Sequence, residues 1–142
     1  MTLGRSEAAA IPEDVSKLLQ DRIASFEQLL VLLLLHRSNP RRWSTKAMAD
    51  NLGIPGGLPE ALMALQAADL IKEETGGPES VYVYAPATTD IAKAVLVLQQ
   101  SYQSHPAAIM QLMSENAIAR VRRAAHRAFS DAFLIRKGKG RG

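Results

Sequence analysis

The sequence predicts a mainly α-helical domain of the α+β class, and three observations support this. Apolar residues recur at helical spacing along most of the chain, and two short alternating runs between residues 70 and 86 are typical of a β-hairpin. Hydrophobic residues make up 47% of the 142 residues, which is enough for one buried core. We therefore expect one domain with helical extensions.

The first part of the chain divides into a leader and a helix. Residues 1–10 are small and polar without periodicity, which predicts a disordered leader. Helical spacing begins at Pro12, a residue suited to a first helical turn, and predicts an N-terminal helix within residues 11–24.

A second helix is predicted from Phe26 to about Arg37. Ser25 followed by Gln28 is a capping-box pattern, and the stretch "LLVLLLL" makes the helix apolar on every side. This run is too short to span a bilayer, so we expect a buried helix and no membrane partner. Its second face needs a cover, either the C-terminal helices of the same chain or a second subunit. In the second case the candidate interface residues are Leu30, Leu33 and Leu34.

Two shorter helices and a hairpin follow. Ser44 is a good N-cap for a helix from Thr45 to about Leu52, and "GIPGG" predicts a turn before a helix from about Leu58 to Ala68. Asp69 stands where a left-handed backbone is common. The runs "LIKEE" and "SVYVYAP" predict a two-stranded hairpin, and we interpret Trp43 as an anchor for the strand before the helix that begins at Thr45.

The remainder, residues 88–135, is predicted to be a helical extension for packing or dimerisation. Thr89 is the expected cap of its first helix, and Pro106 is expected to break or restart that helix. A last helix is expected from Ser114, with an apolar stripe opposite its arginines. Residues 136–142 are predicted to be a basic disordered tail.

The segments "WSTKAMADNLGIP" and "LMALQAADLI" carry a family resemblance. The order of helix, helix, turn, helix and hairpin resembles the winged helix-turn-helix domain of MarR-like and ArsR-like bacterial transcriptional regulators, over about sixty residues. The resemblance implies a winged domain over residues 25–87 with a two-stranded wing and flanking N- and C-terminal helices. It also implies a small DNA-binding transcriptional regulator that acts as a homodimer.

The helix that should read DNA departs from this family pattern. With Leu58, Leu62 and Leu65 inward, the outward or flanking residues are Pro59, Glu60, Met63, Ala64, Gln66 and Ala67. Among them only Gln66 has an amide that could pair with a base edge. Residues 43–86 contain two lysines and six acidic side chains, so this part should be repelled by a duplex.

Two readings of the function stay open. Contacts to double-stranded DNA would use candidates at the start of the helix from Thr45, in the helix from Leu58 and in the C-terminal basic segment: Arg41, Arg42, Thr45, Lys46, Gln66, Arg120, Arg122, Arg123 and Arg127. The alternative is a protein-interaction module that does not read DNA. Its docking surface would be the apolar strip Pro59, Met63, Ala64 and Ala67 with Glu60 at its rim, unless the C-terminal helices cover that strip.

Charge and site chemistry point to binding rather than catalysis. Residues 115–142 carry eight Lys/Arg against two acidic residues, although the whole chain has a net charge of only +3. His36, His105 and His126 are scattered without a second ligand at metal-binding spacing, and no nucleophile or acid–base pair is visible. We expect no enzyme, no cofactor and no metal. The absence of cysteine and of a signal-like apolar stretch favours a cytoplasmic protein.

Overall fold

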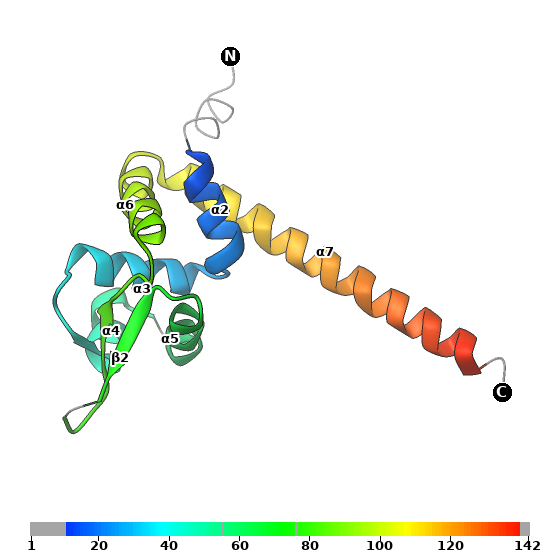
Figure 1. Ribbon diagram of the computed structural model, residues 1–142, viewed down its shortest axis with the longest axis horizontal. Helices are drawn as coiled ribbons and strands as arrows, with labels where there is room; N and C mark the ends of the chain where they lie inside the picture. Colours follow the sequence, from blue (N-terminus) through cyan, green and yellow to red (C-terminus); the bar gives the residue numbers. More distant parts are fainter. Residues whose placement is uncertain (1–10, 55, 76, 140–142) are drawn as a thin grey trace, which may run out of the picture.

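The protein has a winged-helix α+β fold with a long C-terminal helix that leaves the domain (Figure 1). The computed structural model describes residues 11–54, 56–75 and 77–139. The elements in chain order are α2 (Glu13–Arg22), α3 (Phe26–Arg37), β1 (Trp43–Ser44), α4 (Thr45–Leu52), α5 (Leu58–Ala67), β2 (Ile71–Glu74), β3 (Val81–Tyr84), α6 (Thr89–Ser104) and α7 (Pro106–Lys139). The predicted leader lies outside the described residues.

Helix α3 begins at the predicted cap. The Ser25 hydroxyl accepts a hydrogen bond from the Gln28 amide at 3.2 Å, and the Gln28 side chain accepts one from the Ala24 amide at 2.8 Å. The first bond satisfies an amide donor that a helix start leaves unpaired, and the second holds the Gln28 side chain against the residue before the cap. The capping pattern in the sequence is therefore confirmed.

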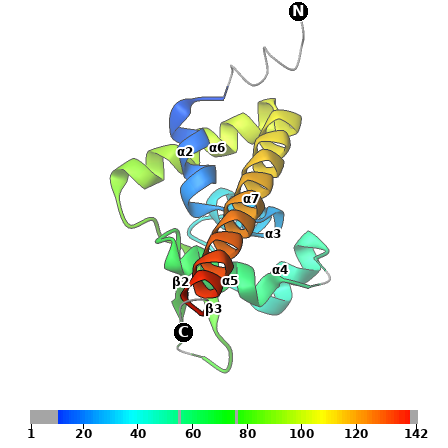
Figure 2. The same ribbon diagram turned by 90° about the vertical axis from the view of Figure 1, so that its right-hand side faces the viewer.

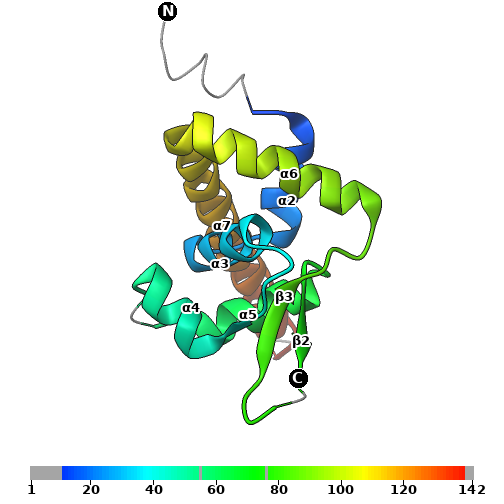
Figure 3. The same ribbon diagram turned by 90° about the vertical axis from the view of Figure 1, so that its left-hand side faces the viewer.

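The all-apolar helix α3 is covered within the chain. Figure 3 shows it in the middle of the domain, with α6 on one side and α4 and α5 on the other. Leu33 and Leu34 are 1% and 3% exposed, and Leu30 is half-buried. The cover is intramolecular, but α4 and α5 contribute to it as well as the C-terminal helix α6. The expectation that Leu33 and Leu34 contact a second subunit is wrong, because the chain's own helices fill that space.

Helices α4 and α5 form the helix-turn-helix unit. Ser44 caps α4 by accepting a hydrogen bond from the Ala47 amide, and Gly53 ends it with a φ of 66°. Asp69 adopts a φ of 63° after α5, and the Leu70 amide donates back to the Leu65 carbonyl at 3.1 Å. A left-handed residue followed by a hydrogen bond that reaches back to the last turn closes a helix end and turns the chain into the next strand. The left-handed backbone predicted at Asp69 is confirmed.

The sheet has one strand more than the two-stranded hairpin predicted. Its order is β1-β3-β2, and the short strand β1 pairs with β3 antiparallel, with Trp43 opposite Tyr82. Trp43 is buried, and its indole N–H donates to the Ser38 hydroxyl at 2.9 Å. A two-residue strand has no alternating pattern of its own, so periodicity could not indicate this pairing.

The C-terminal extension differs from the sequence prediction in three places. Thr88, not Thr89, caps α6, through a hydrogen bond from the Ile91 amide to its hydroxyl. A new helix does begin at Pro106, but this helix, α7, passes Ser114 without a break, so no separate helix starts there. The helix also continues to Lys139, into the segment predicted as a tail, since Lys and Arg are good helix formers and suit a helix C-terminus.

Helix α7 separates from the domain about halfway along its length. Figures 1 and 2 show its first part beside α2 and α6 and its second part projecting away from them. From residue 121 to residue 132 every side chain is exposed except the half-buried Ser130. We call this projecting part of α7, residues 118–139, the arm. None of the helices in the described ranges is long and apolar enough to cross a membrane.

Candidate interaction surfaces

The outer face of α5 is an open apolar strip with an acidic edge. Met63 is 69% exposed, Pro59, Glu60 and Ala67 are exposed beside it, and Ala64 is half-buried. The inward set predicted from the sequence, Leu58, Leu62 and Leu65, is buried. The C-terminal helices do not cover the strip, so that alternative from the sequence is wrong. The reason is that α7 packs on α2 and α6.

The one base-reading candidate on α5 is engaged by the wing. The Gln66 amide nitrogen donates to a Glu73 carboxylate oxygen at 3.3 Å. Hydrogen bonds from Ser80 and then from Gln66 hold the pKa of the Glu73 carboxyl below its usual value. A base edge would have to compete with this carboxylate for the amide, and the same carboxylate would repel a nearby phosphate.

The arginines before α4 are also partnered. Arg42 forms a two-bond ion pair with Glu74 of β2, which holds the pKa of that carboxyl below its usual value. The Arg41 guanidinium lies 3.8 Å from the centre of the Trp43 ring, a cation–π geometry. Lys46 is exposed and Thr45 half-buried. The pairing with Glu74 cancels one of the charges expected to contact phosphate.

The Arg120 side chain bonds to the domain and is not free on the surface. Its guanidinium donates to the carbonyl oxygens of Gln20 at 2.9 Å, Leu19 at 3.3 Å and Ala24 at 3.4 Å. These carbonyls surround the C-terminal end of α2, where a helix lacks intrahelical donors and carries a partial negative charge. Arg120 is the last clamp before α7 leaves the domain. The prediction that Arg120 contacts phosphate is not supported by this arrangement.

The remaining arginine candidates lie together on the arm. Arg122, Arg123 and Arg127 are exposed, as is His126 between them. Another side of the same helix exposes large apolar residues: Ile118 is 52%, Val121 68% and Phe129 70% exposed. The arm thus carries a basic surface and an apolar surface at once, and both are open.

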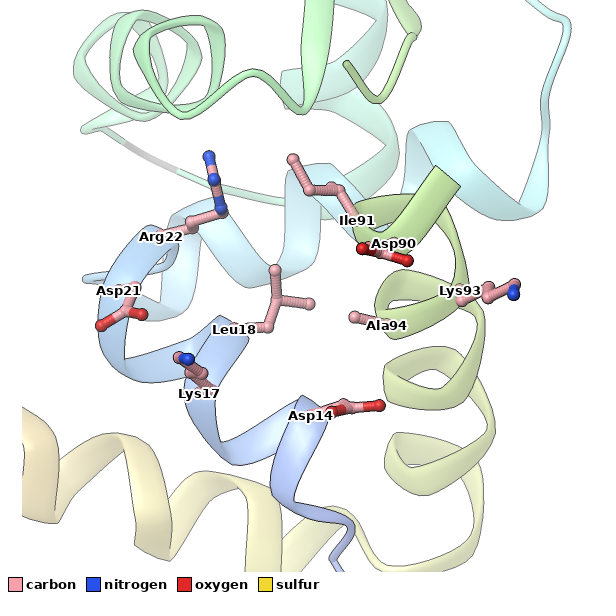
Figure 4. A pocket seen from close by; sticks show the side chains of 9 residues that line it. All are labelled: Asp14, Lys17, Leu18, Asp21, Arg22, Asp90, Ile91, Lys93 and Ala94. Carbon is pink, nitrogen blue, oxygen red and sulfur yellow. The ribbon is translucent and has the colours of Figure 1, made fainter. Parts of the chain in front are cut away.

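A groove that the sequence did not indicate lies between α2 and α6 (Figure 4). It has a volume of about 460 Å³, and Leu18, Ile91 and Ala94 form its apolar part. The charged side chains around it have both signs: Asp14, Lys17, Asp21, Arg22, Asp90 and Lys93. Arg22 also donates to the Ala68 carbonyl at 2.6 Å, so it ties α2 to the end of α5. Such a mixed rim selects neither anions nor cations.

The histidines occupy separate positions. His36 lies in the last turn of α3, where its Nδ1 is 3.3 Å from the Gln99 side-chain oxygen and its ring meets Tyr84 edge-on at 5.0 Å. His105 follows the last residue of α6, and His126 lies on the arm. Across the residues with assigned positions, no three His, Cys, Asp or Glu side chains gather as a metal site would require.

No family model matches the chain, and no curated protein matches it. Two solved structures of mutants of ZitR from Lactococcus lactis are similar, a double mutant with a TM-score of 0.44 and a single mutant with 0.45. Each is 21% identical and covers 80% of this chain, and the matches span 78% and 77% of the ZitR chains. Neither likeness says what this chain binds.

Proposed function

We propose that this protein is a winged-helix regulatory protein whose α5 and wing bind a protein partner rather than the base edges of DNA. The observation that carries this proposal is the open strip around Met63, which is 69% exposed and edged by Glu60. An exposed apolar surface of this kind, rimmed by polar groups, is typical of a protein contact. A methionine at its centre adapts well to a partner's shape.

The electrostatics of the same face support this choice. Nonspecific DNA affinity comes mainly from cations that displace counterions at phosphates. Here Arg42 is already paired with the Glu74 carboxylate, and the Gln66 amide already donates to the Glu73 carboxylate. Glu60 and Glu79 add exposed negative charge to the same helix and wing. A duplex brought against α5 would meet acidic and apolar groups, whereas a protein with apolar and basic side chains would be complementary.

The test is a capture experiment with matched variants. The wild type, Met63→Arg and the control Leu96→Arg would each be immobilised and exposed to lysate from the source organism. Leu96 lies on α6 and is 49% exposed, so its variant adds the same charge to another surface. We expect a protein that is retained by the wild type and by Leu96→Arg but lost with Met63→Arg. Equal retention by all three would contradict an α5 docking site.

A second candidate function is DNA-binding transcriptional regulation. The observation that favours it is the exposed basic group Arg122, Arg123 and Arg127 on the arm, to which Lys46 adds an exposed cation on α4. These side chains can contact phosphates but carry no sequence information on their own. In this reading DNA is held through its backbone, with the α5 face beside it rather than in the groove.

Fluorescence anisotropy distinguishes the two candidates. The protein would be titrated with a random duplex and with a fragment of its own upstream region over a salt series. Binding that weakens steeply with salt and is lost in Arg122→Glu/Arg123→Glu would support DNA contact. If neither duplex binds at low salt, the regulator reading fails and the protein-binding function stands.

We also propose that the protein is a cytoplasmic homodimer, in either function. The arm supports this, because Ile118 and Val121 are 52% and 68% exposed on a helix that leaves its own domain. A single helix with a bare apolar stripe is unfavourable in water, and a second copy supplies an identical stripe. Light scattering at tens of micromolar gives the mass, and a monomer would exclude the dimer.

A further inference from the structure

The apolar stripe of the arm has the spacing of a two-helix coiled coil. Ile118, Val121, Ala125, Ala128 and Ala132 follow one another at intervals of three, four, three and four residues. This is the a/d repeat with which one helix packs against another. Their exposure agrees with it, because all five side chains are open to solvent in the single chain. The stripe is therefore suited to a helical occupant.

The size of the stripe residues indicates a close partner helix. Ala125, Ala128 and Ala132 form the centre and outer part of the stripe, and small residues let two helix backbones approach closely. A lipid surface would instead favour large apolar residues along the whole face. The basic Arg123 and Arg127 lie roughly opposite the stripe by helical geometry, so a paired arm keeps both in water. These features favour a second α7 as the occupant.

We propose that two copies of the chain pair their arms antiparallel, with Ala125 of one opposite Ala128 of the other. This register rests on the homodimer proposed above. It also places Val121 of one copy opposite Ala132 of the other, so this large side chain meets a small one. The pattern is self-complementary about a two-fold axis, as a symmetric dimer requires.

Charge favours the antiparallel direction. In a parallel pair the two arm ends, each with Arg136, Lys137 and Lys139 in the sequence, would lie together and repel. In the antiparallel pair each basic end runs instead toward the base of the other arm, where Glu115 is exposed. The winged domains then lie at opposite ends of the pair.

The base of the arm has room for the end of a second arm. A hollow of about 180 Å³ lies there, lined by Ala24, Phe26, Met110, Met113, Ser114 and Ala117. Phe26 is 38% and Met110 44% exposed, so the apolar surface continues from the stripe onto the domain. The contact proposed here therefore extends beyond two isolated helices.

Cysteine crosslinking tests the register directly, because the chain has no cysteine of its own. Val121→Cys and Ala132→Cys proteins would be mixed, exchanged and oxidised. We expect a disulfide between the two different variants and none within either. Residues 121 and 132 are about 16 Å apart along a helix, at 1.5 Å per residue, so only the antiparallel register brings them together. Crosslinking of Val121→Cys with itself would show a parallel pair and overturn the proposal.

A matched control lies on the other side of the arm. Arg123→Cys and Ser130→Cys would stand at the same level of the antiparallel pair but face away from the stripe. We expect no disulfide between them, and a disulfide as abundant as the 121–132 one would contradict pairing through the stripe. In addition, Ala125→Arg should halve the mass measured by light scattering, whereas Arg123→Ala should leave it unchanged.

Light scattering separates the failure of the register from the failure of the dimer. A wild-type mass of one chain would contradict the homodimer and the register together. A mass of two chains without the 121–132 disulfide would contradict only the register, and the homodimer would stand. Neither result bears on whether α5 binds a protein, because Met63 lies outside the arm.

Discussion

The Arg120 guanidinium lies 2.9 Å from the carbonyl oxygen of Gln20, and this contact fixes α7 to the end of α2. The same group also reaches the Leu19 and Ala24 carbonyls. It supplies donors where helix α2 has none of its own and places a positive charge at the negative end of the helix dipole. Beyond Arg120 the described part of the arm has no such tie to the domain.

Arg120→Ala is expected to destabilise the fold by about 2 kcal/mol, since it removes charged donors from several carbonyls. Urea unfolding measures this loss. Arg120→Lys keeps the charge but not the planar fork, so it should recover only part of the stability. Arg123→Ala, three residues away and exposed, is the control and should stay within about 0.5 kcal/mol of the wild type. Equal effects of the two alanine variants would contradict the clamp.

Met63→Arg is expected to leave the stability of the isolated protein within about 0.5 kcal/mol of the wild type, because the side chain is 69% exposed. Thermal unfolding followed by circular dichroism would measure it. A large loss of stability would mean that Met63 is covered in the free protein. Any loss of partner binding by this variant could then not be assigned to a surface contact.

Leu33→Ala is expected to cost about 3 kcal/mol, because the side chain is 1% exposed in the middle of the core. Leu96→Ala on α6, where the side chain is 49% exposed, should cost much less. The two variants remove the same atoms, so their difference in urea midpoint reports burial alone. Similar midpoints would contradict the intramolecular cover of α3.

Tyr84→Phe is expected to keep or raise stability, by up to about 1 kcal/mol. The Tyr84 hydroxyl is buried and has no hydrogen-bond partner within the described part of the chain, while its ring packs edge-on against His36. Burial also raises the pKa of this hydroxyl. Phenylalanine keeps the ring contact and removes a polar group whose burial costs energy. A clear loss in thermal stability would indicate that the hydroxyl is satisfied.

Stability is expected to fall as the pH drops below about 4.5. The pKa values of the Glu73 and Glu74 carboxyls are lowered in the folded protein, the second mainly by the hydrogen bond from Arg42. A lowered folded-state pKa gives stability that is present above the unfolded value and is lost as the pH falls through the folded value. Arg42→Ala should flatten this part of the profile, measured by urea unfolding from neutral to acidic pH. An unchanged slope would contradict the role of the pair.

Local signals made much of the fold predictable. Ser25 and Ser44 cap helices as expected, and Asp69 takes the left-handed backbone, because each rule involves residues within a few positions. The start of α6 was misplaced by one residue because Thr88 and Thr89 are chemically equal cap candidates. The uninterrupted α7 was missed because the cap-like Ser114 suggested a new start.

The candidate surfaces were only partly predictable. The outward residues of α5 follow from helical periodicity, and Met63 is indeed open. The partners of the predicted cations could not be predicted, since Arg42 and Glu74 are 32 positions apart in the sequence and Arg120 and Gln20 are 100 apart. Such pairs depend on how elements pack, which no local pattern records. Exposed charge in a sequence is therefore a weaker sign of a nucleic-acid contact than it looks.

The continuity of α7 also makes it a lever. From Arg120 to Lys139 the helix runs about 28 Å, at 1.5 Å per residue. A tilt of about 10° at the Arg120 clamp would then displace the far end by about 5 Å, close to one helical turn. Whatever grips the outer end of α7 is thus mechanically coupled to its junction with α2, the distant end of the domain from the wing. Small adjustments in packing at that junction therefore change the position of the outer end of α7 relative to the domain.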